Sequence, residues 1–125
     1  MTMYKNIIRL YCQALLENDY QTMISLFSGD ARVFSFLAGE KPPSEFYRNL
    51  FAVSRRTNVE LKNVFIDFDN KTTAAAYICI ESILKENITL KVEAVDIFEF
   101  DSEHKIKTLK IILDTYPLRM LKMSE

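Results

Sequence analysis

Three short polar turns divide the second half of the chain into four segments that have the composition of β-strands. The segments cover residues 58–69, 72–84, 88–101 and 106–116, and Pro117 follows the last of them. Strands joined by turns this short usually pair with their neighbours in antiparallel fashion. The second half of the chain therefore predicts a four-stranded antiparallel meander.

The first half of the chain has mainly helical periodicity. We expect a helix over 3–17, a short helix over 20–27, a strand over 31–36, a loop over 37–43 and a helix over 45–55. Asp19 and Ser44 are residue types that favour helix N-caps, and each directly precedes a predicted helix. Helices first and a sheet afterwards indicate an α+β fold, with the helices on one face of the sheet.

Size and composition fit one domain over residues 1–125. Apolar residues make up 49% of the chain and charged residues 26%, which is typical of a globular protein. Two glycines and three prolines leave no flexible linker. The net charge of −1 gives no electrostatic basis for binding nucleic acid or an anionic membrane, so we expect neither partner.

Residues that commonly hold metals are sparse. Cys12 and Cys79 lack the spacing of metal ligands, and the single histidine, His104, lies in a polar run. The sequence has no glycine-rich phosphate loop, so we expect no metal and no cofactor. It has no signal-peptide pattern and no long apolar run, which predicts a cytoplasmic protein with reduced thiols. Pairing of the two cysteines on folding stays open.

Two of the predicted strands are apolar on both faces. Residues 73–84 and 109–113 lack the clean alternation of a sheet with one solvated face. Because the predicted helices cover only one face, a second copy of the chain is the simplest cover for the other. We therefore expect a homodimer formed through the sheet.

Asp96 is an unexpected residue in the third of the predicted strands. It shares one face of the strand with Ala94, Phe98 and Phe100. Two interpretations are open: a solvated or ion-paired carboxylate, or an acid in an apolar pocket with a raised pKa. Glu81 would face the same side as Asp96 if the hairpin between them has no bulge, and the other side if the register slips by one residue.

Three stretches resemble one known superfamily and together cover much of the chain. They are residues 10–33 (LYCQALLENDYQTMISLFSGDARV), 44–51 (SEFYRNLF) and 95–119 (VDIFEFDSEHKIKTLKIILDTYPLR). They are similar to the nuclear-transport-factor-two-like superfamily, and more narrowly to ketosteroid isomerases and the small SnoaL-like polyketide cyclases. The resemblance implies a cone-shaped fold, with three N-terminal helices packed on a curved antiparallel sheet.

The resemblance also implies a site. In ketosteroid isomerases a helix tyrosine and a protonated strand aspartate form an oxyanion hole, and these catalytic positions fall on Tyr11 and Asp96. We also expect Phe27, Ser35, Tyr47, Phe98 and Leu113 to contact the ligand, the first three of them at positions that the resemblance implies. Ser35 occupies the position of the isomerases' acidic general base, and Phe27 replaces a supporting tyrosine. Since a serine hydroxyl cannot take a proton from carbon unaided, steroid isomerase activity is not expected.

These observations predict a protein that binds an apolar small molecule with a carbonyl or hydroxyl group. Catalysis, if present, would be of an isomerase, cyclase or dehydratase type. The alternative is a non-catalytic dimerisation or protein-interaction module with a filled cavity; a subunit of a larger enzyme stays open. A pocket of roughly 300 Å³ or more beside Tyr11 and Asp96 would favour ligand binding. A cone plugged by Phe34, Phe36 or Phe98 would favour the interaction module.

Overall fold

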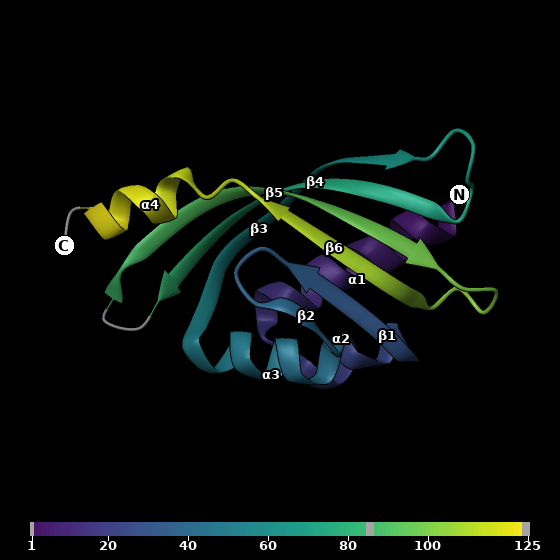
Figure 1. Cartoon of the computed structure of the whole chain (residues 1–125), viewed down its shortest axis with the longest axis horizontal. Helices are drawn as coiled ribbons and strands as arrows, with labels where there is room; N and C mark the ends of the chain where they lie inside the picture. The colour runs from purple at the N-terminus through teal and green to yellow at the C-terminus, as the bar shows by residue number, and fades with distance from the viewer. Residues whose placement is uncertain (1, 85–86, 124–125) are drawn as a thin grey trace.

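The computed structural model describes residues 2–84 and 87–123, which form four helices around one six-stranded sheet (Figure 1). In chain order the elements are α1 (Thr2–Glu17), α2 (Tyr20–Ser25), β1 (Phe27–Ser35), β2 (Gly39–Lys41), α3 (Pro43–Val53), β3 (Ser54–Ile66), β4 (Thr73–Leu84), β5 (Thr89–Phe100), β6 (Ile106–Leu113) and α4 (Tyr116–Met123). The α+β class and the long meander β3–β6 follow the sequence-based prediction.

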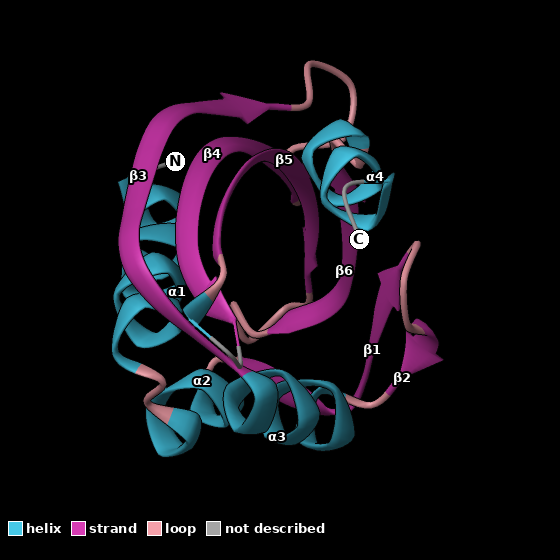
Figure 2. Ribbon diagram, turned by 90° about the vertical axis from the view of Figure 1, so that its left-hand side faces the viewer, coloured by secondary structure: helices cyan, strands magenta, loops and turns pink. Residues whose placement is uncertain are grey.

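The sheet is mixed rather than wholly antiparallel, which corrects one part of that prediction. Its strand order is β2-β1-β6-β5-β4-β3, and β1 runs parallel to β6. A parallel pair needs a long crossover between its strands, and here α3 and the other strands of the meander supply it. Figure 2 shows how strongly the long strands curl, with α2 and α3 lying across the open side of the curve.

The core lies between α1 and the concave face of the curled sheet. Along β5 every second side chain is buried, from Val92 to Phe100, as expected for a strand with one covered face. Small alanines at Ala74, Ala76 and Ala94 are buried on this face, and the aromatic side chain of Tyr11 is buried in the same core. Full burial of a side chain such as Phe98 stabilises the fold by about 1.5–3 kcal/mol.

Several element boundaries differ from the sequence-based prediction. Asp19 is an N-cap as predicted, with its Oδ1 accepting from the Thr22 amide at 3.1 Å. Ser44 is not a cap, because Pro42 holds that position and Pro43 starts α3; proline suits the first helical turn, where its missing N–H would be unpaired anyway. Residues 28–30, which lie between the predicted short helix and the predicted strand, belong to β1, whose register with β6 is irregular there.

Two further elements, β2 and α4, lie where the sequence predicted no regular structure. The predicted loop over 37–43 contains β2, which pairs with the end of β1. The predicted third helix was too long, since α3 ends at Val53 and the chain enters β3 at once. β6 ends at Leu113, before the predicted end of the strand at residue 116, and Pro117 lies in the first turn of α4.

The register of β4 with β5 settles which side chains share a face. Asp96 lies opposite Ala76 on the concave face, while Glu81 lies opposite Lys91 on the convex face. No register shift interrupts this pair of strands. The expectation that Glu81 would face the side of Asp96 in a hairpin without a bulge is therefore wrong, and Glu81 is outside the concave site.

Candidate ligand-binding cavity

A cavity of about 240 Å³ opens between the concave face of the sheet and helices α1, α3 and α4. Its walls are mostly aliphatic. They are formed by Tyr11, Leu15, Ser35, Leu37, Phe46, Leu50, Val53, Ser54, Arg56, Ile80, Ser82, Leu84, Leu90, Val92, Ala94, Asp96, Ile111, Leu113 and Leu118. Among these lining residues, Asp96 carries the one carboxylate and Arg56 the one cation.

Asp96 is held in the protein interior by its place on β5. It is 2% exposed, and its Oδ1 has no hydrogen-bond partner among the described residues. Burial raises the pKa of Asp96 to about 7, although the Tyr11 hydroxyl nearby acts in the opposite direction as a potential donor. The carboxyl group is therefore largely neutral below pH 7 and can then donate a hydrogen bond.

Tyr11 of α1 and Tyr47 of α3 meet beside Asp96. Their hydroxyl oxygens are 2.6 Å apart, and both side chains are fully buried. The Tyr11 ring also packs edge-on against Phe98, with centroids 5.3 Å apart. Burial raises the pKa of both phenols well above the usual value, so both keep their protons at neutral pH. One hydroxyl donates to the other, which leaves one O–H for a further acceptor.

Arg56 is a cavity residue that the sequence did not reveal. It directly follows the predicted helix over 45–55, but it lies in β3 with its side chain turned to the concave face. It is 5% exposed and donates to Ser54 Oγ at 2.8 Å, to the Ser54 carbonyl at 2.9 Å and to Asn18 Oδ1. Its guanidinium lies 5.3 Å from the centroid of the Phe51 ring.

No local sequence signal distinguishes Arg56 from its neighbour Arg55. The two are adjacent in one short polar run, and only the register of β3 with β4 separates them: Arg56 lies opposite the buried Ser82, and Arg55 opposite Ile83. The strand parity of this segment could have indicated the difference, but only once the end of α3 was known.

The residues predicted from the sequence fall into two groups. Tyr11, Ser35, Asp96 and Leu113 line the cavity, and Tyr47 stands one hydrogen bond behind it. Ser35 Oγ accepts from the Leu37 amide at 3.3 Å. The other two do not line the cavity: Phe27 packs against Tyr47 and Phe98 against Tyr11, both within the core.

The size of the cavity bears on the two functions that the sequence left open. Its volume of about 240 Å³ lies just below the roughly 300 Å³ at which drug-sized ligand sites begin. None of the three phenylalanines that might have plugged it does so, because Phe34 and Phe36 are exposed and Phe98 is packed in the core. An unplugged cavity of this size has room for one small ligand of one or two rings.

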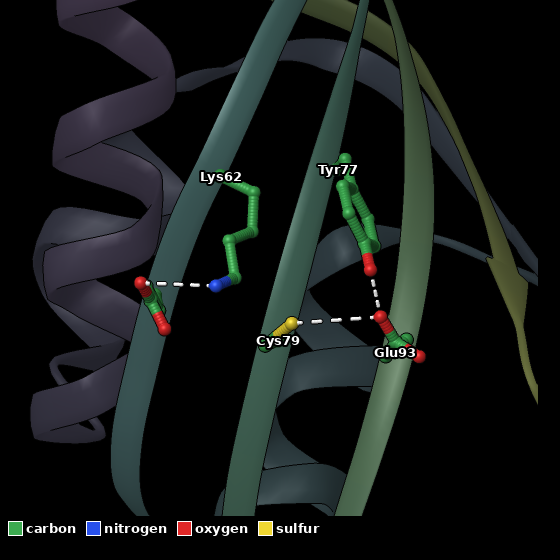
Figure 3. Close-up of polar contacts among 5 residues, drawn as sticks. Lys62, Tyr77, Cys79 and Glu93 are labelled. Carbon is green, nitrogen blue, oxygen red and sulfur yellow. Dashed lines mark hydrogen bonds and ion pairs between the residues drawn. The ribbon is translucent and has the colours of Figure 1, made fainter.

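A separate polar group lies on the convex face of the sheet (Figure 3). Glu93 accepts a hydrogen bond from the Tyr77 hydroxyl, and the Cys79 sulfur lies 3.8 Å from the same carboxylate. Lys62 pairs with Glu60 at 3.3 Å. Glu93 and Asp96 therefore belong to the same strand but to different environments.

The described part of the chain also lacks a metal cluster and a membrane-spanning helix. No three His, Cys, Asp or Glu side chains there come together in a way that could hold a metal ion. None of the helices in this part has both the length and the apolar character needed to cross a membrane.

Comparison with known proteins finds similarity at the level of structure. No protein-family model and no curated protein matches the sequence. Solved structures match over most of the chain, among them the epoxide hydrolase/cyclase-like enzyme SalBIII, which has a role in pyran ring formation in the polyether salinomycin. It is 16% identical with a TM-score of 0.76, and the match covers 91% of this chain and 92% of SalBIII.

Two further structures show the same similarity. An LEH-like epoxide hydrolase of M. tuberculosis is 13% identical with a TM-score of 0.77, covering 100% of this chain and 98% of that one. A protein of unknown function with a cystatin-like fold from Methylobium petroleophilum is 15% identical with a TM-score of 0.70, covering 90% and 76%. At these identities the matches establish the fold alone: the chain has the cone-shaped α+β fold that the resemblance implied.

Proposed function

We propose that the chain binds a small apolar molecule and receives a carbonyl or hydroxyl oxygen of that molecule at Asp96 and Tyr11. The observation that carries the proposal is the unpartnered Oδ1 of Asp96, which is buried at the wall of an aliphatic cavity. A buried polar atom without a partner destabilises the protein by about 1–3 kcal/mol. A ligand oxygen that accepts from the neutral carboxyl group would remove that cost.

The same two donors support a reaction class. Neutral Asp96 and Tyr11 can both donate to an oxygen on which negative charge develops, as when a ketone loses a neighbouring proton. Such preorganised donors are worth about 2.7–4 kcal/mol each in comparable sites. Isomerisation, ring closure and dehydration next to a carbonyl all pass through such a charge. SalBIII and the M. tuberculosis epoxide hydrolase are similar in fold, and their named activities also concern substrate oxygens.

This chemistry is limited because the described lining residues include no second carboxylate that could act as a general base. Asp96 is the one acid among the described lining residues, and Ser35 has no base beside it. The base must therefore come from the substrate, from water or from ionised Asp96 itself. The small cavity and the serine both disfavour a steroid isomerase, so we place one- and two-ring ketones ahead of steroids.

Binding can be tested with 2-tetralone, a two-ring ketone, and the hydrocarbon tetralin. Calorimetric titration at pH 6 should show tighter binding of the ketone to the wild type. Asp96→Leu should remove this preference, whereas Asp96→Asn, which keeps an N–H donor, should retain it. Glu81→Gln on the convex face is the matched control. Equal affinity of the wild type for ketone and hydrocarbon would contradict the proposal.

Catalysis can be tested on the same ketone through exchange of its α-hydrogens with deuterated water, followed by NMR. The wild type should accelerate exchange over buffer, and Asp96→Leu should lower the acceleration by about 10²–10³-fold, the loss typical for one oxyanion donor. Binding without accelerated exchange would leave a non-catalytic ligand carrier as the function.

We further propose that two copies associate through the convex face of the sheet, and that the protein is cytoplasmic, where free thiols such as Cys12 and Cys79 are typical. Large apolar side chains are exposed on the convex face at Phe65, Val95 and Ile112. Analytical ultracentrifugation should find a dimer at micromolar concentration and a monomer for Val95→Lys. A monomeric wild type would refute the association.

A further inference from the structure

Arg56 is a buried cation with no anionic partner among the described residues. Its three hydrogen bonds go to uncharged acceptors, namely Ser54 Oγ, the Ser54 carbonyl and Asn18 Oδ1. These use three of the five N–H donors of a guanidinium, and its Nε is buried without a partner in the part of the chain that the structure describes. None of the ion pairs among the described residues includes it. Among the described residues the charge of Arg56 is thus stabilised only by these dipoles and by the Phe51 ring, with no opposite charge.

A cation in this position is costly for the fold. Charged groups are almost never fully buried unless they are paired, and burial shifts the pKa of Arg56 below its usual value. The guanidinium also lines the aliphatic cavity. An anion that entered the cavity would therefore meet a charge that is already desolvated and held in place by Ser54 and Asn18.

The register of the sheet places Arg56 and Asp96 at different ends of the concave face. Arg56 lies opposite Ser82 and Asp96 opposite Ala76, so they are separated along β4 by six residues, or on the order of 20 Å of strand. The cavity side chains between these ends include Ile80, Val92 and Ala94, all apolar. The site thus has a cationic end, an apolar middle and an end with neutral oxygen donors.

We infer, resting on the proposed function, that the ligand is an apolar monocarboxylic acid with a keto or hydroxyl oxygen. Its carboxylate lies against Arg56, its hydrocarbon part fills the middle of the cavity, and its second oxygen lies at Asp96 and Tyr11. One arginine offsets one negative charge, which suits a carboxylate better than a phosphate dianion. Arginine is also the side chain whose planar fork best matches carboxylate geometry.

The inference can be tested with 12-oxotridecanoic acid, a keto acid whose chain is long enough for its two polar groups to reach opposite ends of the cavity, and its methyl ester, titrated by calorimetry at pH 6. The wild type should bind the acid about ten- to a hundredfold more tightly than the ester, the range typical for a hydrogen bond to a charged group. In Arg56→Met the acid-to-ester affinity ratio should fall to about one. Arg55→Met, which removes the neighbouring exposed cation, should leave the ratio unchanged.

A measurement on the wild type guards against misfolding of the Arg56 variant. In ¹⁵N NMR spectra the Arg56 Nε–H resonance should shift when the acid is added and stay in place with the ester. If the ester binds as tightly as the acid, or if the acid binds without moving this resonance, the inference is wrong while the proposed function stands. If neither compound binds but 2-tetralone does, the inference is likewise wrong. If 2-tetralone also fails to bind, the proposed function falls with it.

Discussion

Glu93 and Asp96 lie on the same strand, β5, yet the two faces of the sheet give them different environments. On the convex face Glu93 is exposed and accepts from Tyr77. On the concave face Asp96 is buried, with an oxygen that has no partner within the described ranges 2–84 and 87–123 and a pKa raised to about 7 by that burial. Strand parity, rather than residue type, decides which of the two carboxylates can serve a ligand.

The largest difference between the two faces should be in how much an aromatic side chain contributes to stability. Phe98→Ala on the concave face should lower the free energy of unfolding by about 3–5 kcal/mol, the usual cost of removing a buried ring. Phe65→Ala on the convex face, where the ring is 58% exposed, should cost below about 1 kcal/mol. Urea unfolding followed by circular dichroism measures both. A loss for Phe65→Ala that grows with protein concentration would instead show that a second copy covers the ring.

The next largest difference should be in how the carboxylate on each face makes stability depend on pH. The pKa of Asp96 is about 7 in the folded state and about 3.9 in the unfolded chain, so the folded protein holds a proton that the unfolded chain releases. Stability should therefore fall as the pH rises from about 4 to 7 and level off above that, by up to about 4 kcal/mol in all.

Variants assign this pH effect to its source. Tyr11, Tyr47 and Cys12 lie near Asp96, but burial raises their pKa values as well, to about 12 for Cys12, so they do not titrate between pH 5 and 8. Urea unfolding at pH 5 and pH 8 should show the decrease in the wild type and in Glu93→Gln. Asp96→Asn should lack it, and a decrease that persists in this variant would assign the effect to another group.

The smallest difference in stability should be between removing a buried tyrosine hydroxyl, that of Tyr47, and removing an exposed one, that of Tyr77. Tyr47→Phe removes the buried partner of Tyr11 and should cost about 1–3 kcal/mol, since it leaves a buried hydroxyl without its partner. Tyr77→Phe removes an exposed hydrogen bond to Glu93 and should cost less than about 0.5 kcal/mol. Equal losses of stability in the two variants would mean that the Tyr77 hydroxyl on the convex face is not exposed to solvent.

Periodicity predicted the elements better than it predicted their ends. The alternation around Asp96 was visible in the sequence, and so was the helical stripe that carries Tyr11, because each pattern extends over many residues. Arg56 was missed because its place depends on the residue at which α3 stops. Neither the parallel pairing of β1 with β6 nor the volume of the cavity has a local signal. Both arise only when residues far apart in the chain pack together.

The pairing of β1 with β6 affects the order in which the parts of the fold can form. Val33, near the start of the chain, finds its sheet neighbour Leu109 only near the end. Contacts this distant in sequence slow folding, because a long loop must close before they form. During synthesis β1 can pair with β2 early, but it must wait for its second neighbour until the residues of β6 have left the ribosome.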